Sequence, residues 1–254
     1  MKIVIITQDE PFYLARNIRY LFESLPASVD VVGCVLSDAS PFGKKENIII
    51  KAKKTFKVFG LVFFLRYFAR FVKGKIFARD GVLKILRQFK IPRINLKTSI
   101  NSRQSLKLIR ALEPDLLVSI MGNEIFKKEL INLAPKGCIN LHTALLPKYR
   151  GLMPSFWVLK NKEKETGVSV FFVDEGIDSG PIIVQKRIPL AGLALEELIK
   201  KSKKLGMDAI VEAIDLIERD AVELIPNNNN DKTYFTFPTR EDVCAFRRKG
   251  KKFF

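Results

Sequence analysis

The chain has 254 residues, 47% of them hydrophobic, and a formal net charge of +17. Three well-separated cysteines and a single histidine argue against a structural zinc site, so we expect no metal. The low cysteine count, a first segment unlike a signal peptide and the lack of any apolar run near the roughly 20 residues that span a bilayer predict a cytoplasmic protein.

The first 36 residues predict a strand, a helix and a second strand. The run at 3–7 is apolar, as in a strand that is buried on both faces. Leucine, isoleucine and phenylalanine then recur at helical spacing from Leu14 until Pro26 stops the helix. A segment rich in β-branched residues follows at 29–36. This order predicts an α/β fold with a parallel sheet.

The next segment is strongly basic. Residues 44–93 contain 15 lysines or arginines and only two acids, which accounts for +13 of the net charge. Arg66, Arg70 and Lys73 recur at i, i+4 and i+7, so they share one helical face, and aromatic residues lie largely on the other. We therefore predict a basic amphipathic helical insert at about 44–90.

The alternation of helices and strands then resumes. The pattern predicts helices at 82–89, 102–112, 125–133, 154–160 and 195–217, and strands at 115–120, 137–142, 167–173 and 182–188. The asparagine run at 227–231 marks a linker. We expect one domain at 1–225, including the insert, and a C-terminal extension at 226–254.

The only histidine lies at the end of a predicted strand. Residues i and i+2 of a strand point to the same face, so Asn140 and His142 present an amide and an imidazole side by side. Imidazole is the side chain suited to proton transfer near neutral pH. The run at 143–151 predicts a shaped loop at the carboxyl edge of the sheet, where ligands bind in α/β folds. The alternative is an ordinary polar residue at a strand end.

A second polar loop lies between the predicted strands at 167–173 and 182–188. It reads Asp-Glu-Gly-Ile-Asp-Ser-Gly-Pro from Asp174 to Pro181. Glycines permit a close approach of the backbone to a ligand. A carboxylate from this loop could orient His142 and stabilise its charged form. Alternatively, Asp178 only caps a turn, because Asp before Ser-Gly is common in turns.

These motifs together resemble a known family. Asn-x-His, then x-x-Leu-Leu-Pro-x-Tyr-Arg-Gly, then Asp-x-Gly-x-Asp-Ser-Gly-Pro from residue 174 resemble the folate-dependent formyltransferases. That family includes methionyl-tRNA, glycinamide ribonucleotide and nucleotide-sugar formyltransferases. The resemblance is close over 114–189. It implies a Rossmann-like catalytic domain, N10-formyltetrahydrofolate as formyl donor, and a catalytic triad of Asn140, His142 and Asp178.

The resemblance and the chemistry suggest a role for each member of the triad. Asn140 would donate a hydrogen bond to the formyl oxygen as it becomes negative. His142 would accept a proton from the attacking amine, or donate one to the oxyanion when charged. Asp178 would fix the ring and relay protons with an ordered water. The resemblance also implies that two loops contact the folate, through Met121, Gly122, Asn123 and Ile125 in one and Asp174, Gly176 and Ile177 in the other.

Acceptor contacts are expected at the end of the first strand and in the loop after His142. The candidates are Gln8, Asp9, Thr143 and Arg150. The turn Thr-Gln-Asp-Glu-Pro-Phe from residue 7 has no glycine, so we do not expect a backbone phosphate cradle there. Asp9 and Glu10 could bind amino or hydroxyl groups of an acceptor, or cap the following helix. Arg150 could bind a substrate phosphate or pair within its own loop.

The sequence therefore predicts transfer of a formyl group to an amine, with an amino sugar as the favoured acceptor. The residues after 217 are expected to be too few for the C-terminal β-barrel that helps the family's tRNA enzymes to hold tRNA. Three alternatives stay open: a methionyl-tRNA formyltransferase-like enzyme, a formyltetrahydrofolate hydrolase and a non-catalytic basic membrane-binding module.

Three interpretations of the basic insert are open. It could be a helical cover packed on the sheet, a peripheral contact with the inner membrane face, or an RNA contact. The sequence does not decide the oligomeric state, for which a homodimer is one option.

Overall fold

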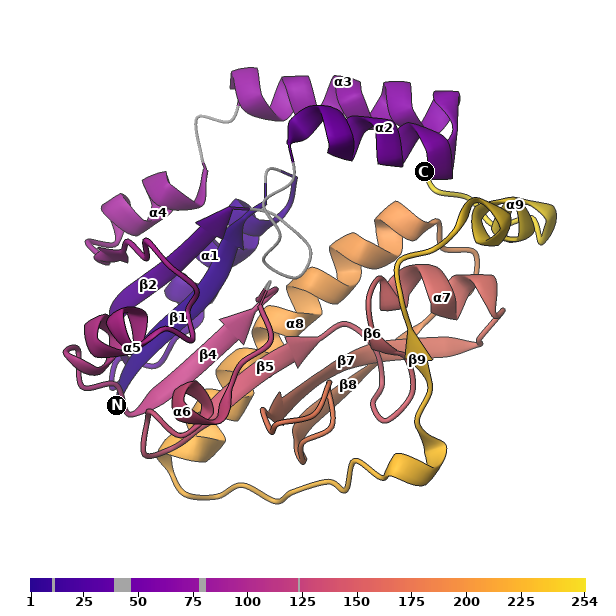
Figure 1. Cartoon of the computed structure of the whole chain (residues 1–254). Coiled ribbons are helices and arrows are strands. Elements are labelled where there is room, and N and C mark those ends of the chain that lie inside the picture. The colour runs from indigo at the N-terminus through magenta and orange to yellow at the C-terminus, as the bar shows by residue number, and fades with distance from the viewer. Residues whose placement is uncertain (11, 39–46, 78–80, 123) are drawn as a thin grey trace.

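The computed structural model describes residues 1–10, 12–38, 47–77, 81–122 and 124–254 (Figure 1). Its centre is a seven-stranded sheet in the order β3-β2-β1-β4-β5-β7-β8. The strands are β1 (Lys2–Asp9), β2 (Asp30–Asp38), β3 (Arg93–Ile94), β4 (Leu116–Ile120), β5 (Cys138–His142), β7 (Glu165–Phe172) and β8 (Ile182–Pro189). The five strands from β3 to β5 are parallel, and β7 runs antiparallel to both β5 and β8. The predicted α/β fold with a mostly parallel sheet is confirmed.

Helices cover both faces of the sheet (Figure 1). One face packs on α1 (Leu14–Ser24), α4 (Val82–Gln88) and α8 (Leu195–Glu218), and the other on α5 (Arg103–Arg110) and α6 (Lys128–Ile131). Alternate residues of β1 serve the two faces: Ile3 and Ile5 join the first cluster, and Val4 and Ile6 join the second. All four are almost fully buried, as the strands of a covered parallel sheet require.

A second core lies beyond the carboxyl end of β8, where Ile188 and Leu190 belong to it. It contains α7 (Pro154–Lys160) and α9 (Arg240–Arg248), and the rings of Phe156 and Phe246 stack with centroids 4.9 Å apart. The chain reaches α9 through the 3-10 helix η2 (Asn229–Asp231) and β9 (Tyr234–Phe235). Strand β9 pairs in parallel with β6 (Arg150–Gly151). Residues 226–254 therefore pack against the segment that follows His142.

The basic segment forms a helical hairpin of α2 (Ile48–Phe59) and α3 (Leu61–Phe77), which lies above the rest of the chain in the view of Figure 1. Gly60, with φ of +80°, joins the two helices in a conformation that favours glycine. The predicted helical insert is confirmed, but neither the bounds of α2 nor the turn that separates it from α3 was predicted. The N-terminus of α2 is capped by Asn47, whose side chain accepts from the Ile49 N–H at 3.1 Å. Among the described helices, none is long and apolar enough to cross a membrane.

Helix α9 was not predicted, and the other differences from the predicted elements are small. The helix predicted at 125–133 has helical geometry only at Lys128–Ile131, and residues 125–127 approach it as an irregular segment. Strands β3, β6 and β9 have two residues each, too few to show any periodicity.

Candidate active site

Strand β5 places Asn140 and His142 on one face of the sheet. Ile139 and Leu141 alternate with them and point into the core against α8. Gly206 of α8 makes room for this packing, because a Cβ there would lie 2.6 Å from Leu141 Cδ2. Ile139 and Leu141 hold the strand against the core, and Asn140 and His142 point to the opposite face, as the alternation predicts. On that face Asn140 is half-buried and His142 is buried.

Two contacts define the orientation of the imidazole. His142 Nε2 lies 2.8 Å from the carbonyl oxygen of Tyr149, and Nδ1 lies 3.5 Å from Asp178 Oδ2. A carbonyl oxygen can only accept, so Nε2 carries a hydrogen and donates a hydrogen bond to the Tyr149 carbonyl. The second nitrogen, Nδ1, is therefore the one that can gain or lose a proton, and it faces a carboxylate.

Asp178 is held in place from two sides. Its Oδ2 accepts from the Gly151 N–H at 2.9 Å, and its backbone carbonyl accepts from Asn227 Nδ2 at 3.0 Å. Asn227 also donates to the carbonyl of Gly180 at 2.8 Å. The φ of Asp178 is +49°, a left-handed conformation that costs a non-glycine residue on the order of 1 kcal/mol and persists where its surroundings impose it. The loop thus delivers this carboxylate to His142.

The loop that carries the Tyr149 carbonyl is fixed by β7 and β8. Ser169 of β7 donates from Oγ to the Ala144 carbonyl at 2.8 Å and accepts from the Leu146 N–H at 3.1 Å. Gln185 of β8 donates to the Leu146 carbonyl at 2.8 Å. The Leu146–Pro147 peptide is cis. These buried bonds determine where Tyr149 meets the imidazole.

The C-terminal segment closes over the same loop. The N–H groups of Tyr149 and Arg150 donate to the side chain and the carbonyl of Thr233, at 2.8 and 2.9 Å. Gly151 has φ of +92°, and a Cβ there would lie 2.3 Å from the carbonyl oxygen of Phe235. Glycine is therefore required where the two segments cross. The N–H that Asp178 uses belongs to this glycine.

Arg150 faces the C-terminal segment. Its guanidinium donates to the side chains of Asn227 and Asn229, both at 2.8 Å, and the residue is only 4% exposed. The arginine therefore anchors the C-terminal segment, and its predicted contact with substrate is not supported by this position. Thr143, another predicted acceptor contact, is half-buried beside His142.

The first predicted folate loop follows β4, the strand next to β5. Ser119 of β4 is the register partner of Asn140. Met121 has a left-handed backbone with φ of +59°, and Gly122 packs so closely that a Cβ would lie 2.7 Å from Ser119 Oγ. Ile125 is 57% exposed. The predicted contact at Asn123 lies outside the described residues.

The second predicted folate loop runs along β5. It begins with the Val173 N–H donating to the Cys138 carbonyl at 2.7 Å and reaches His142 through Asp178. Asp174 Oδ1 accepts from the Gly176 N–H at 3.0 Å and from Ser179 Oγ at 2.6 Å, so this carboxylate shapes the turn. The exposed side of the loop includes Ile177 and Gly176.

The predicted acceptor residues at the end of β1 are separated from β5 by β4. Gln8 is half-buried and Asp9 is exposed. The carboxylate of Glu10 accepts from the N–H groups of three residues at the start of α1, at 2.9, 3.0 and 3.1 Å. Of the two interpretations of Glu10, the helix cap is therefore the one that the structure shows.

A buried lysine, Lys203 of α8, lies between the β1 turn and the β4 loop. Its Nζ contacts Met121 Sδ and is 4.0 Å from Glu10 Oε2. Burial lowers the pKa of this ammonium, and the nearby Glu10 carboxylate only partly opposes the shift. Sequence reasoning missed this residue because it is one of several lysines in an amphipathic helix.

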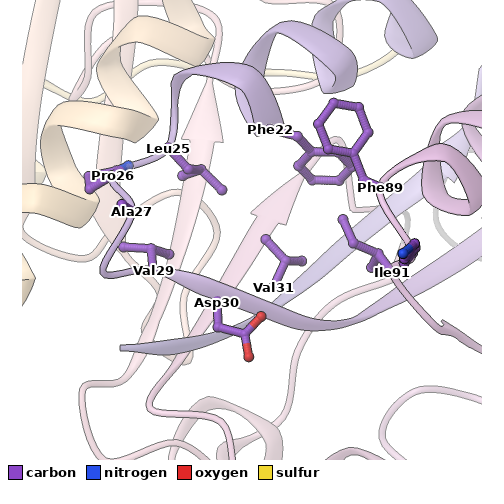
Figure 2. Close-up of a pocket in the computed structure, with 10 residues that line it drawn as sticks. Phe22, Leu25, Pro26, Ala27, Val29, Asp30, Val31, Phe89 and Ile91 are labelled. Carbon is purple, nitrogen blue, oxygen red and sulfur yellow. The ribbon is translucent and has the colours of Figure 1, made fainter.

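A hollow of about 310 Å³ lies away from these residues, at the amino ends of β2 and β3 (Figure 2). Figure 2 shows Phe22 and Phe89 side by side at one end of it, with ring centroids 5.3 Å apart. It lies at the opposite edge of the sheet from the carboxyl end of β5, so we assign it no part in the site.

Comparisons with known proteins place these features in a family. The family model for formyl transferase matches residues 84–214. The methionyl-tRNA formyltransferase of Kosmotoga olearia is 35% identical over 172 residues, which are 67% of this chain and 55% of that protein. The methionyl-tRNA formyltransferase of Desulforamulus reducens is 35% identical over 167 residues, which are 64% of this chain and 51% of that protein. The chain spans about half the length of these curated relatives.

Solved structures share the fold at lower sequence identity. The phosphoribosylglycinamide formyltransferase of Anaplasma phagocytophilum aligns with a TM-score of 0.64 and 17% identity, over 94% of this chain and 99% of that one. A sugar N-formyltransferase from Shewanella sp. FDAARGOS_354 aligns with a TM-score of 0.61 and 19% identity, over 98% and 87%. Because the family model matches more than half of its residues, the chain belongs to the formyl transferase family.

Proposed function

We propose that this chain transfers a formyl group from N10-formyltetrahydrofolate to an amine, with Asn140, His142 and Asp178 as its catalytic residues. The observation that carries the proposal is the pairing of His142 Nδ1 with Asp178 at 3.5 Å, on the strand that also presents Asn140. In a chain of the formyl transferase family, this arrangement supplies a proton acceptor beside a hydrogen-bond donor.

The residues around Asn140 fit a bound donor. Among the described residues, none hydrogen-bonds to the half-buried Asn140 side chain, so its amide N–H groups are available to a ligand. The two predicted folate loops lie on either side, one after β4 and one along β5, with Ile125 and Ile177 exposed. We assign folate contact to these loops. The donor supplies the formyl group that is transferred.

The protein's own groups then have defined tasks. The Asn140 amide donates to the oxygen that becomes negative as the amine attacks, a contribution worth about 3 kcal/mol in comparable sites. His142 Nδ1 takes the proton that the amine loses, because Nε2 is already committed to Tyr149. The Asp178 carboxylate stabilises the resulting imidazolium at 3.5 Å.

An amino sugar is the acceptor that we favour. The exposed carboxylate of Asp9 at the end of β1 suits a hydroxyl or amino group, and the turn there has no glycine for a phosphate cradle. Sugar N-formyltransferases are among the solved structures with this fold. Methionyl-tRNA is the second candidate, because the relatives that are 35% identical are methionyl-tRNA formyltransferases.

The test is an acceptor panel with the full chain and N10-formyltetrahydrofolate. Nucleotide-linked amino sugars and methionyl-tRNA are offered separately, and release of tetrahydrofolate is measured beside mass detection of the formylated product. We expect product with an amino sugar and loss of turnover in His142→Ala. Turnover with methionyl-tRNA alone would overturn the sugar acceptor.

Two further outcomes would overturn the transferase itself. Formate release without any acceptor would identify a hydrolase, in which water replaces the amine. The absence of turnover on every acceptor, with no binding of the folate donor, would leave a non-catalytic member of the family.

A further inference from the structure

The outer face of the α2–α3 hairpin is apolar and exposed. Leu61, Leu65 and Phe68 recur at i, i+4 and i+7 along α3 and are 57%, 55% and 51% exposed. Val62 beside them is 79% exposed, and α2 adds an exposed Phe56. Side chains of this size rarely gather on a free surface, so this face is expected to have a partner.

The exposure does not arise from a loosely attached hairpin. On its inner side Phe59 stacks on Phe63 at 4.5 Å, and Phe63 meets Phe253 of the C-terminal segment at 5.1 Å. Arg247 of α9 donates to the carbonyl of Phe59 at 2.7 Å. The hairpin thus has an anchored inner face and a separate apolar outer face.

The hairpin is also anchored to the starts of α1 and α8. Arg70 of α3 donates to the hydroxyl of Tyr13 at 3.0 Å and pairs with Glu196 at 2.9 Å. The ring of Tyr67 lies 4.8 Å from that of Phe12. A partner that binds the outer face of the hairpin is therefore attached to the core of the protein through the hairpin.

The charge of the hairpin points to the chemistry of the partner. Residues 47–77 contain eight lysines or arginines and no acid. Lys53 and Lys57 are exposed on α2, and Lys53 follows the exposed Ile49 by one helical turn. Cationic and large apolar side chains thus share the exposed side of one element. Burial of apolar area and attraction of cations to anionic lipids are the two contributions that bind a helix at an anionic bilayer interface.

We propose that the outer face of the α2–α3 hairpin docks on an anionic phospholipid surface. An RNA backbone would be neutralised by the lysines but would gain nothing from Leu61, Leu65 and Phe68. A second copy of the same hairpin would bring exposed lysines such as Lys53 and Lys57 against their own like charges, which opposes self-association. A bilayer with anionic headgroups accommodates both features. This inference goes beyond formyl transfer and does not depend on it.

Vesicle co-sedimentation of the full chain tests the proposal. Vesicles of phosphatidylcholine alone are compared with vesicles that also contain phosphatidylglycerol. Two variants weaken the two attractions separately: Val62→Ser with Leu65→Ser, and Lys53→Gln with Lys57→Gln. The matched control, Lys107→Gln with Leu108→Ser, makes the same kinds of change on the exposed side of α5, away from the hairpin (Figure 1).

We expect binding to the anionic vesicles only. The lysine variant should bind about 25-fold more weakly, on the basis of about five-fold for each charge near an anionic surface. The affinity of the serine variant for the anionic vesicles should fall by about ten-fold or more. The control should bind like the wild type, and thermal unfolding should show that all the variants are folded.

Three results would overturn the proposal. The first is no binding of the wild type to anionic vesicles. The second is a loss of vesicle binding in the α5 control as large as that in the hairpin variants. The third is undiminished vesicle binding by the hairpin variants. Salt-dependent binding of tRNA that the lysine variant weakens, without vesicle binding, would identify the hairpin as an RNA surface instead.

Discussion

The carbonyl oxygen of Tyr149 lies 2.8 Å from Nε2 of His142 and thereby decides which imidazole nitrogen faces Asp178. With Nε2 committed as a donor, Nδ1 points at the carboxylate, 3.5 Å away. The backbone of a loop seven residues along the chain thus sets the tautomer of the proposed general base. The same loop supplies the Gly151 N–H that orients Asp178.

We predict that Asp178→Asn lowers kcat by roughly 10² to 10⁴-fold, the usual range for assistance to a general base. The amide oxygen of asparagine can still accept from the Gly151 N–H, so the loop should keep its conformation. What is lost is the charge that stabilises the imidazolium. The measurement is kcat for formyl transfer, with thermal unfolding to verify the fold.

Glu175→Gln provides the matched control, because it removes one carboxylate from an exposed position in the same loop. A loss of activity as large as that of Asp178→Asn would mean that the net charge of the loop, rather than its pairing with His142, is what matters.

Asn140→Ala tests the proposed oxyanion contact. The Asn140 amide has no hydrogen bond to the described residues, so its removal should leave the free energy of unfolding nearly unchanged. We expect kcat to fall by about 10² to 10³-fold while KM for the folate donor changes little, because the hydrogen bond strengthens as charge develops. An equal rise in KM with kcat unchanged would assign Asn140 to donor binding instead.

The central part of this site could be predicted from sequence because it depends on local patterns. The alternation of Ile139 and Leu141 with Asn140 and His142 determines which side chains share a face. The Asp-Ser-Gly-Pro run indicates a tight turn, and the structure places its aspartate beside the histidine. Each of these inferences uses residues within a few positions of one another.

The parts of the site that could not be predicted from sequence depend on contacts between distant segments. Strand β9 pairs with β6 across more than eighty residues, and each strand is too short to have a pattern. The Tyr149 carbonyl and the Gly151 N–H are backbone groups, which every residue possesses, so no sequence feature marks them. Asn227 lies in an asparagine run that composition alone identifies as a linker.

Helix α2 was not delimited within the predicted insert, and α9 was not predicted, for different reasons. Helix α2 has apolar residues on both its inner and outer sides, Phe59 and Phe56, so it shows no simple amphipathic stripe. Helix α9 did have a signal: Thr239 and Asp242 form a reciprocal capping box, with bonds of 2.8 and 3.2 Å. The Thr-x-x-Asp spacing was enough to predict its first turn.

Lys203→Met should raise stability at neutral pH. The substitution removes a buried ammonium, and Glu10 keeps its three backbone donors at the start of α1. Burial lowers the pKa of Lys203 in the folded state below its ordinary value of 10.5. Between those two pKa values the unfolded chain binds more protons, so the stability of the wild type rises with pH in that window.

The advantage of the Lys203→Met variant should therefore shrink as the pH is raised toward 10.5. Urea unfolding at several pH values measures it. Lys204→Met is the control, because this neighbouring lysine is exposed and its removal should produce no such trend. An advantage that stays constant with pH would show that the packing of methionine, and not the ammonium, is responsible.

The final prediction concerns Asn227, which joins the C-terminal segment to the aspartate of the proposed triad. Its amide donates to the carbonyls of Asp178 and Gly180, so Asn227→Ala leaves these two carbonyls without that donor. Arg150 loses the bond to Asn227 Oδ1 but keeps its bond to the backbone carbonyl of residue 227. We expect a loss of about 1–3 kcal/mol in the free energy of unfolding. We also expect a fall in kcat, because Asp178 loses the bond that holds its strained backbone. Asn228→Ala, at the exposed next position, should change neither quantity. If Asn227→Ala lost stability but kept the wild-type kcat, the C-terminal segment would stabilise the fold without positioning Asp178.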